Sequence, residues 1–209
     1  LIKVVQDGAP CTIWARYDLG AAGLVGFLQD FEQVRNTMPV VDNTVIQHGV
    51  EQGVPAFLCE RSMARVLTSG LRLSGAEAGR RVRAAEHLAG RHTMTGEPVG
   101  PFRPHLAAAQ RAGTITPEQV SVIDTALRGV DGRGFDPAEI EAGEQILVEA
   151  AASLGPADLR NLAFAWSDQG RDEAAEVVAC LAPSPLRERL LVTVLAAHGE
   201  LVRLGDVVP

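Results

Sequence analysis

Apolar side chains recur at intervals of three and four residues along most of the chain, as they do on helices with one apolar face. The first such stretch begins at residue 21, and its apolar side chains share one helical face: Leu24, Phe27, Leu28, Phe31 and Val34. Helices are also expected around residues 45–50 and, after the break at Gly53-Val54-Pro55, from Leu58 to Leu67.

Three further helix starts are marked by side chains that cap a helix. In each, a Ser, Thr or Asp is followed three residues later by Glu or Gln: Ser74 with Glu77, Thr116 with Gln119, and Asp136 with Glu139. Gly155-Pro156 predicts the start of another helix that includes Trp166 in its apolar face, and further helices are expected after Gly170 and from Ser184-Pro185. The pattern predicts an all-α, bundle-like domain of many helices.

The first residues follow a different pattern. The segments IKVV and CTIW, joined through Gly8 and Pro10, are compatible with a short β-hairpin, and a truncated or foreign leader explains them equally well. We therefore divide the chain into a divergent N-terminal segment (1–38), a helical domain (39–165) and a helical tail (166–209).

Composition narrows the class of protein without indicating its activity. The chain has 209 residues, of which 46% are hydrophobic and 22% charged, as in ordinary globular proteins. No apolar run reaches the length of about 18 residues that a membrane-spanning helix needs. We therefore expect no membrane association. Cys11, Cys59 and Cys180 form no disulfide framework, which predicts a cytoplasmic location, and they are interpreted as buried apolar groups. No signal peptide is recognised, and the missing initial Met suggests a fragment.

The charge is unevenly distributed. The net charge is −7, yet residues 61–112 hold nine arginines against three glutamates, a formal charge of +6. Helical spacing counted from Arg80 places small apolar residues on one side, namely Ala78, Val82, Ala85 and Ala89. It places a row of cations on the other side, namely Arg80, Arg83, His87 and Arg91. The candidate nucleic-acid-binding residues are Arg72, Arg80, Arg81, Arg83 and Arg91. The alternative is that these arginines decorate a solvated helix and reflect a general preference for Arg over Lys.

The segment before this arginine-rich helix adds two more cations. Arg61 and Arg65 lie on the short helix that is expected to end at Thr68-Ser69-Gly70. A glycine-containing connection between two helices is compatible with a helix-turn-helix, although such helix pairs occur in many bundles.

The order of motifs from about Pro39 to Ala163 resembles a known family. A leucine- and arginine-containing helix is followed by SGAEAGRR, a TGEP turn, PHLAAA, a GTITPEQVSVID helix and an acidic helix that ends near LGPADL. This series is similar to the 13E12-repeat family, the domain of unknown function numbered 222. The resemblance implies an all-α domain that usually precedes an HNH nuclease module in a mobile-element protein.

The residues for such a nuclease are missing from this chain. HNH chemistry needs paired His or Asn side chains at a divalent metal, and the five histidines here are scattered. We expect no catalytic residues, no cofactor and no metal site, including at His87 and His92. The acids of residues 137–153 are interpreted as a solvated helix face: Glu139, Glu141, Glu144 and Glu149.

Two functions remain open from the sequence. In the first, the chain is a non-catalytic accessory domain that contacts double-stranded DNA through arginine–phosphate pairs, beside a nuclease module in its parent protein. In the second, it is a protein-interaction or self-association module without a nucleic-acid role, and its basic middle docks on an acidic region such as residues 137–153. A homo-oligomer is compatible with either.

Overall fold

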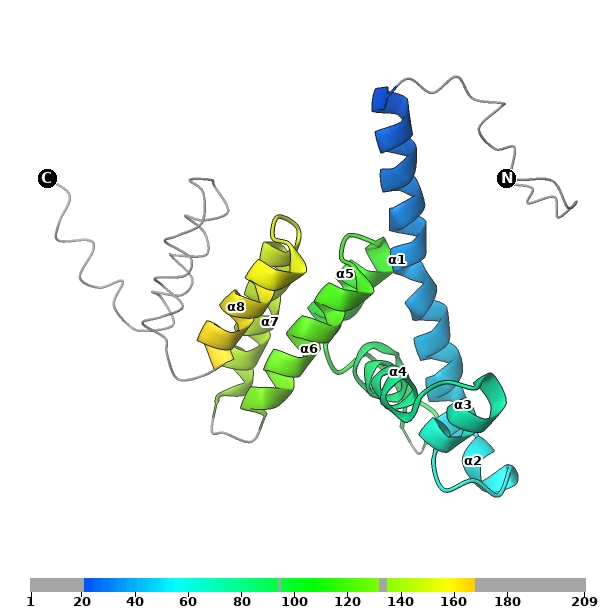
Figure 1. Ribbon diagram of the computed structural model, residues 1–209. Helices are drawn as coiled ribbons and strands as arrows, with labels where there is room; N and C mark the ends of the chain where they lie inside the picture. The colour runs from blue at the N-terminus through cyan, green and yellow to red at the C-terminus, as the bar shows by residue number, and fades with distance from the viewer. Residues whose placement is uncertain (1–20, 94, 132–134, 168–209) are drawn as a thin grey trace, which may run out of the picture.

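The computed structural model describes residues 21–93, 95–131 and 135–167, and nearly all elements in these ranges are helices (Figure 1). This confirms the all-α prediction. The expected N-terminal hairpin and the helices after Gly170 fall on residues outside the described ranges. The helices are α1 (Ala21–Glu51), α2 (Val54–Phe57), α3 (Met63–Leu71), α4 (Gly75–Leu88), α5 (Pro104–Ala112), α6 (Pro117–Val130), α7 (Pro137–Ala151) and α8 (Pro156–Ser167).

The strands in the described part of the chain form one small antiparallel hairpin between α4 and α5. β1 (Arg91–His92) pairs with β2 (Pro98–Val99), and Arg91 lies opposite Val99. Gly96 occupies the turn with a φ of 85°, a conformation that glycine adopts without steric cost.

One of the expected helix boundaries is wrong. The segment around 45–50 is helical as expected, and it forms the end of α1, which continues without a break for 31 residues and runs across residue 38. The helix expected from Leu58 to Leu67 begins later, at Met63, where the Ser62 side chain accepts the N–H of Arg65. A one-turn helix, α2, begins at the Gly53-Val54-Pro55 break instead.

The capping signals are largely confirmed. Thr116 with Gln119 and Asp136 with Glu139 both form complete capping boxes, in which each side chain bonds the backbone of the other residue. Ser74 accepts the N–H of Glu77, but the Glu77 carboxylate binds arginines instead of the Ser74 amide. The starts of α4, α6 and α7 are thus set by local hydrogen bonds.

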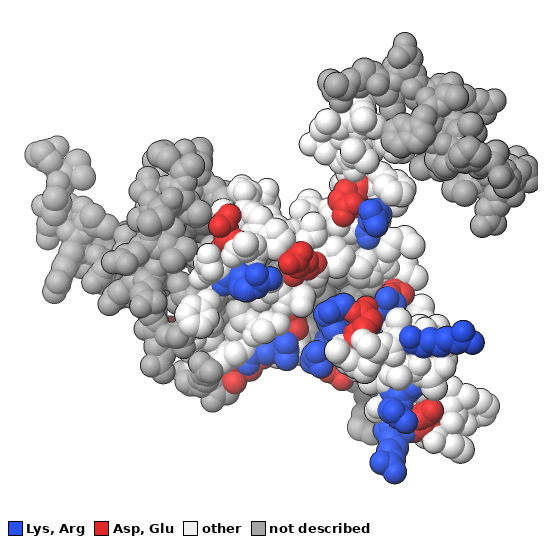
Figure 2. Space-filling view, in the orientation of Figure 1, with Lys and Arg blue, Asp and Glu red and all other residues white. Residues whose placement is uncertain are grey.

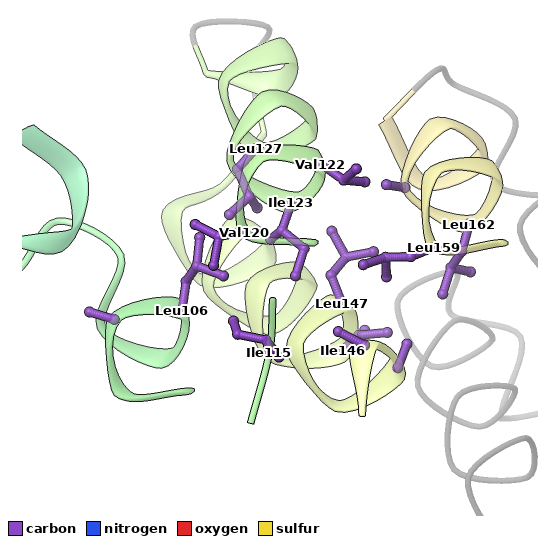
Figure 3. Packing of buried hydrophobic residues seen from close by; sticks show 14 of the residues in the cluster. Leu106, Ile115, Val120, Val122, Ile123, Leu127, Ile146, Leu147, Leu159 and Leu162 are labelled. Atoms are coloured by element: carbon purple, nitrogen blue, oxygen red, sulfur yellow. The ribbon is translucent and has the colours of Figure 1, made fainter. Parts of the chain in front are cut away.

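The main core lies among α5, α6, α7 and α8, where apolar side chains from all four helices meet (Figure 3). Its fully buried side chains include Leu106, Ile123, Leu127, Leu147 and Leu159. A smaller cluster joins α1, α3 and α4 through Ile46, Leu67, Ala78 and Ala85. The long α1 packs on α4 and α5 with its C-terminal half, while its N-terminal half extends beyond the other described helices (Figure 1).

Candidate functional site

The arginines of α4 are partly neutralised by carboxylates. Arg80 and Arg81 both bind Glu77, one turn earlier on the same helix, and Arg81 also reaches Asp42 of α1 at 2.9 Å. Arg83 is exposed and has no ion-pair partner within the described residues. Pairing reduces the charge available to an outside phosphate, so the predicted row keeps one unpaired cation on this helix.

The prediction that Arg91 belongs to this helical row is wrong. α4 ends at Leu88, and Arg91 lies in β1, where its guanidinium carbon is 6.0 Å from the centre of the Phe102 ring. The helix stops because Ala89 leaves the helical conformation with ψ near 150°. Helical angles counted past Leu88 therefore do not apply to Arg91.

The turn between α3 and α4 differs from the expected one. Thr68, Ser69 and Gly70 remain helical, and the chain turns at Arg72, Leu73 and Ser74. Arg72 has a φ of 57°, a left-handed conformation that is unusual for a residue with a side chain. Leu73 packs into the small cluster below the turn, so the two helices are joined by a short anchored connection.

Four arginines from just before α3 to the middle of α4 are exposed and lack a carboxylate partner within the described part of the chain. In Figure 2 the basic side chains over this region are interspersed with acidic ones and do not form a continuous stripe. The four residues are Arg61, Arg65, Arg72 and Arg83.

A buried polar junction, which the sequence did not reveal, joins α4, α6 and the start of α5. Arg103 is 3% exposed, and its guanidinium binds both carboxylate oxygens of Asp131 at 2.7 and 2.9 Å. His87 of α4 bonds Asp124 of α6 through Nδ1. Phe102 covers the junction, with its ring centre 4.6 Å from the Arg103 guanidinium carbon. These pairs hold α4, α6 and the start of α5 together.

The interpretation of the acids of α7 as a solvated face is wrong for Glu144. Its side chain is buried against the main core, with 2% of the residue exposed, and its Oε1 accepts the N–H of Leu106 at 2.8 Å. Since α5 has no side-chain cap of its own, Glu144 supplies an acceptor for its first turn. Burial raises the pKa of Glu144 above its ordinary value.

The described histidines and cysteine do not gather into one site. His87 faces Asp124, whereas His92 faces Glu51 with its Nδ1 3.0 Å from the carboxylate. Hydrogen bonds from Gln47 and His92 hold the pKa of Glu51 below its ordinary value. Cys59 is exposed, which contradicts its prediction as a buried apolar group. Within the described ranges, no three His, Cys, Asp or Glu side chains are grouped as metal ligands would be.

An exposed apolar surface lies on α1. We define the apolar face of α1 as the row of large hydrophobic residues along its outer side. Apart from the half-buried Leu24, its members are 37% to 64% exposed, and the ring centres of Phe27 and Phe31 stack 6.1 Å apart. Its members are Leu24, Phe27, Leu28, Phe31, Val34, Met38, Val41 and Val45.

The polar side of α1 is the side that packs on the rest of the molecule. Gln33 and Asn36 donate their side-chain N–H groups to the carbonyls of Ala112 and Gly113 at the end of α5, each at 3.2 Å. Asn43, which is also buried, donates to the side chain of Gln110 at 2.9 Å. Helix ends leave carbonyl groups without helical partners, and these amides satisfy them. α1 is therefore docked on α5 through these amides and on α3 and α4 through Ile46, with its apolar face outward.

The sequence profile of the family described as Domain of unknown function (DUF222) matches residues 25–199. The chain belongs to this family. The match starts inside α1 and ends beyond Ser167, so it extends past both limits of the resemblance found from the motifs, and DUF222 includes the apolar face of α1.

Curated relatives of this DUF222 chain occur in mycobacteria. An uncharacterized protein of Mycobacterium tuberculosis is 30% identical over 159 residues, which are 76% of this chain and 35% of the relative. An uncharacterized protein of Mycobacterium bovis is 31% identical over 149 residues, 69% of this chain and 32% of the relative. The chain thus spans about a third of the length of these relatives. No solved structure matches it significantly.

The described helices also bear on the question of membrane insertion. None of the helices in the described ranges combines the length and the apolar character required to cross a bilayer.

Proposed function

We propose that this DUF222 chain is a non-catalytic helical interaction domain that binds another protein surface through the apolar face of α1. The observation that carries the proposal is the orientation of α1, which buries Asn36, Asn43 and Gln47 and exposes Phe31, Val34 and other large hydrophobic residues. An amphipathic helix normally does the reverse, because apolar surface is more stable away from water.

The size and continuity of this face support the same proposal. Single exposed hydrophobic residues are common on soluble proteins, whereas contiguous apolar patches mark interaction surfaces. Here the exposed side chains follow one another from Phe27 to Val45 on one side of one helix. The N-terminal half of α1 extends beyond the other described helices, so a partner has access along it (Figure 1).

Site-specific photo-cross-linking tests the proposal. We would place a benzophenone amino acid at Met38, on the apolar face, and in a control variant at Gln29, which is exposed away from that face. Irradiation of the full chain, alone and in extract of its source cells, should give protein adducts from position 38 that are absent from position 29. Mass spectrometry would identify the protein and the residue attached. The proposal fails if position 38 gives no adduct, or gives the same adducts as position 29.

Binding to nucleic acid is a second candidate function, favoured by the four exposed arginines of α3, α4 and their flanking residues that have no carboxylate partner within the described ranges. Guanidinium groups suit phosphate oxygens, and helices joined by a short turn can lie across a duplex. The net charge of −7 counts against strong binding, but a local basic surface acts over distances of about 10 Å. In this proposal the chain is an accessory domain, and any nuclease module lies elsewhere in a longer parent protein.

Fluorescence anisotropy with a labelled DNA duplex tests this second function. Four phosphate contacts predict a slope of log affinity against log salt of about −3.6, which is roughly a hundredfold weakening from 50 to 200 mM salt. Arg65→Glu with Arg83→Glu should abolish binding, while Arg111→Glu, an equally exposed arginine on α5, should leave most of it. Equal loss in both variants would show that only net charge matters.

A further inference from the structure

The apolar face of α1 has a regular spacing that restricts what can cover it. Apart from Leu28, which falls at an e position, its residues alternate between steps of three and four, so they occupy the a and d positions of successive heptads. Such a 3.5-residue repeat is the pattern of helices that wind around a second helix and interlock side chains with it. Positions a are Leu24, Phe31, Met38 and Val45, and positions d are Phe27, Val34 and Val41.

We propose that this face binds the same face of a second copy of the chain, as a parallel, in-register two-stranded coiled coil. The inference rests on the proposed interaction function and names its partner. A two-fold interface must be complementary to itself, and in a parallel pair each a or d residue meets its own equivalent. The heptad row of α1 fulfils this requirement without any other segment.

The rest of the chain leaves room for a second copy. The residues that dock α1 on α4 and α5, such as Asn36 and Asn43, lie on the side of the helix roughly opposite the a and d row. Two copies related by a two-fold axis along the row would therefore place their α4–α8 regions on opposite sides. The extension of the N-terminal half of α1 beyond the other described helices is consistent with this arrangement (Figure 1).

Charge favours the parallel orientation. In a parallel coiled coil a g residue faces the e residue five positions later on the other helix. Here that rule pairs Asp30 with Arg35 of the second copy, twice by symmetry. The opposite orientation would bring Arg35 to Asp42, but Asp42 already binds Arg81 at 2.9 Å. Arg35 lies at the edge of the face, with its guanidinium carbon 5.8 Å from the Phe31 ring centre, and it pairs with Glu32 of the same helix at 3.4 Å. Both side chains of that pair are more than half exposed, so little is lost when Arg35 turns to Asp30 of the second copy.

Pro39 lies within the stretch of α1 that carries the a and d residues, but it is not one of them. It occupies the b position, on the packed side of α1, and removes one backbone hydrogen bond within the helix. The charged pair of Asp30 and Arg35 lies in the N-terminal part, before Pro39. Tests of register should therefore be placed between Leu24 and Met38.

Disulfide trapping tests the register directly. Cys11, Cys59 and Cys180 are first replaced by Ser, and Val34→Cys is compared with Gln29→Cys in the full chain. Residue 34 should meet its own equivalent across the row and form a disulfide-linked dimer under mild oxidation. Residue 29 is exposed but faces away from the row and should stay largely reduced. Sedimentation of the unmodified chain should show a species of twice the 22.1 kDa chain mass.

Charge exchange tests the orientation. Asp30→Arg and Arg35→Asp each place like charges opposite one another in the parallel pair, and each should weaken dimerisation several-fold. The double variant restores opposite charges and should recover dimerisation close to that of the natural chain. An antiparallel pair through Asp42 would respond to Arg35→Asp alone, and the double variant would not recover.

The outcomes separate this inference from the function on which it rests. A chain that stays monomeric at high concentration, or equal trapping at positions 34 and 29, overturns the dimer. If Met38 then cross-links to a different protein or to residues of the same chain beyond Ser167, the dimer is excluded. Cross-linking to a different protein would leave the interaction function standing. Cross-linking within the same chain would overturn the interaction function as well.

Discussion

Gly113 is the residue at which the end of α5 meets the backbone of α1, and its replacement tests how α1 is docked. Gly113 has a φ of 71°, and a Cβ atom built on it would lie 2.6 Å from the carbonyl oxygen of Gln33 and 2.9 Å from its Cγ. Carbon and oxygen atoms do not approach so closely without a shift of one helix. Gly113→Ala should therefore push α1 away from α5.

The expected cost has two parts. An alanine in the left-handed conformation costs about 1–2 kcal/mol, and forcing a methyl group into a packed contact costs about 1–3 kcal/mol. The variant should lose about 2–5 kcal/mol of unfolding free energy, a large share of the roughly 5–15 kcal/mol that stabilises a typical domain. For a chain of this size the midpoint of thermal unfolding should fall by roughly 5–15 °C. The amide bonds from Gln33 and Asn36 to α5 should weaken at the same time.

A second glycine with a similar backbone conformation separates the conformational cost from the steric cost. Gly53 has nearly the same φ, 68°, but nothing lies within 4 Å of a Cβ atom at that position. Gly53→Ala should therefore cost only the conformational part, about 1–2 kcal/mol. Denaturant unfolding would measure both variants, and hydrogen exchange should show loss of protection in α1 only for Gly113→Ala. Equal destabilisation by the two substitutions would refute the close docking of α1 on α5.

Two further predictions concern the main core. A Cβ atom on Gly143 would clash with the ring of Trp166, so Gly143→Ala should destabilise the fold. A Cβ atom on Gly129 would contact nothing, so Gly129→Ala should stabilise its helix by up to about 1 kcal/mol. Calorimetry would measure both changes. Stabilisation by both would contradict the packing. Because burial raises the pKa of Glu144, the folded state binds this proton more tightly than the unfolded state does. The contribution of Glu144 to stability therefore falls as the pH rises from the ordinary pKa of the carboxyl through its raised pKa. Glu144→Gln keeps an acceptor for the N–H of Leu106 but cannot titrate, so its unfolding free energy should lose this part of the pH dependence. A pH dependence equal to that of the natural chain would contradict the role given to Glu144.

Local signals allowed much of the helical structure to be predicted. The starts of α6 and α7 follow from Thr116 with Gln119 and from Asp136 with Glu139, because both partners of a capping box lie within four consecutive residues. The alanines of α4 were also placed correctly, since Ala78 and Ala85 are buried. These features depend on nearest neighbours along the chain, which a sequence displays directly.

The candidate sites depended on contacts between residues far apart in the sequence. Helical spacing placed Arg91 beside Arg80, but α4 ends before Arg91, and Arg80 is bound to Glu77. Spacing also placed Glu144 among solvated acids, although it accepts the N–H of Leu106, 38 residues away. A pattern of charge shows which residues share a helix face, and it does not show what the rest of the chain places against that face.

The sequence by itself determined the all-α class of the described part of the chain, where several of its helices begin, and that α1 has one apolar face. Only the tertiary structure decided that this face points outward. The reason is that the end of α5 presents carbonyl groups that need hydrogen-bond donors, and the amides of Gln33 and Asn36 supply them. Docking through these amides turns the hydrophobic row from Leu24 to Val45 away from the core, where another helix can cover it.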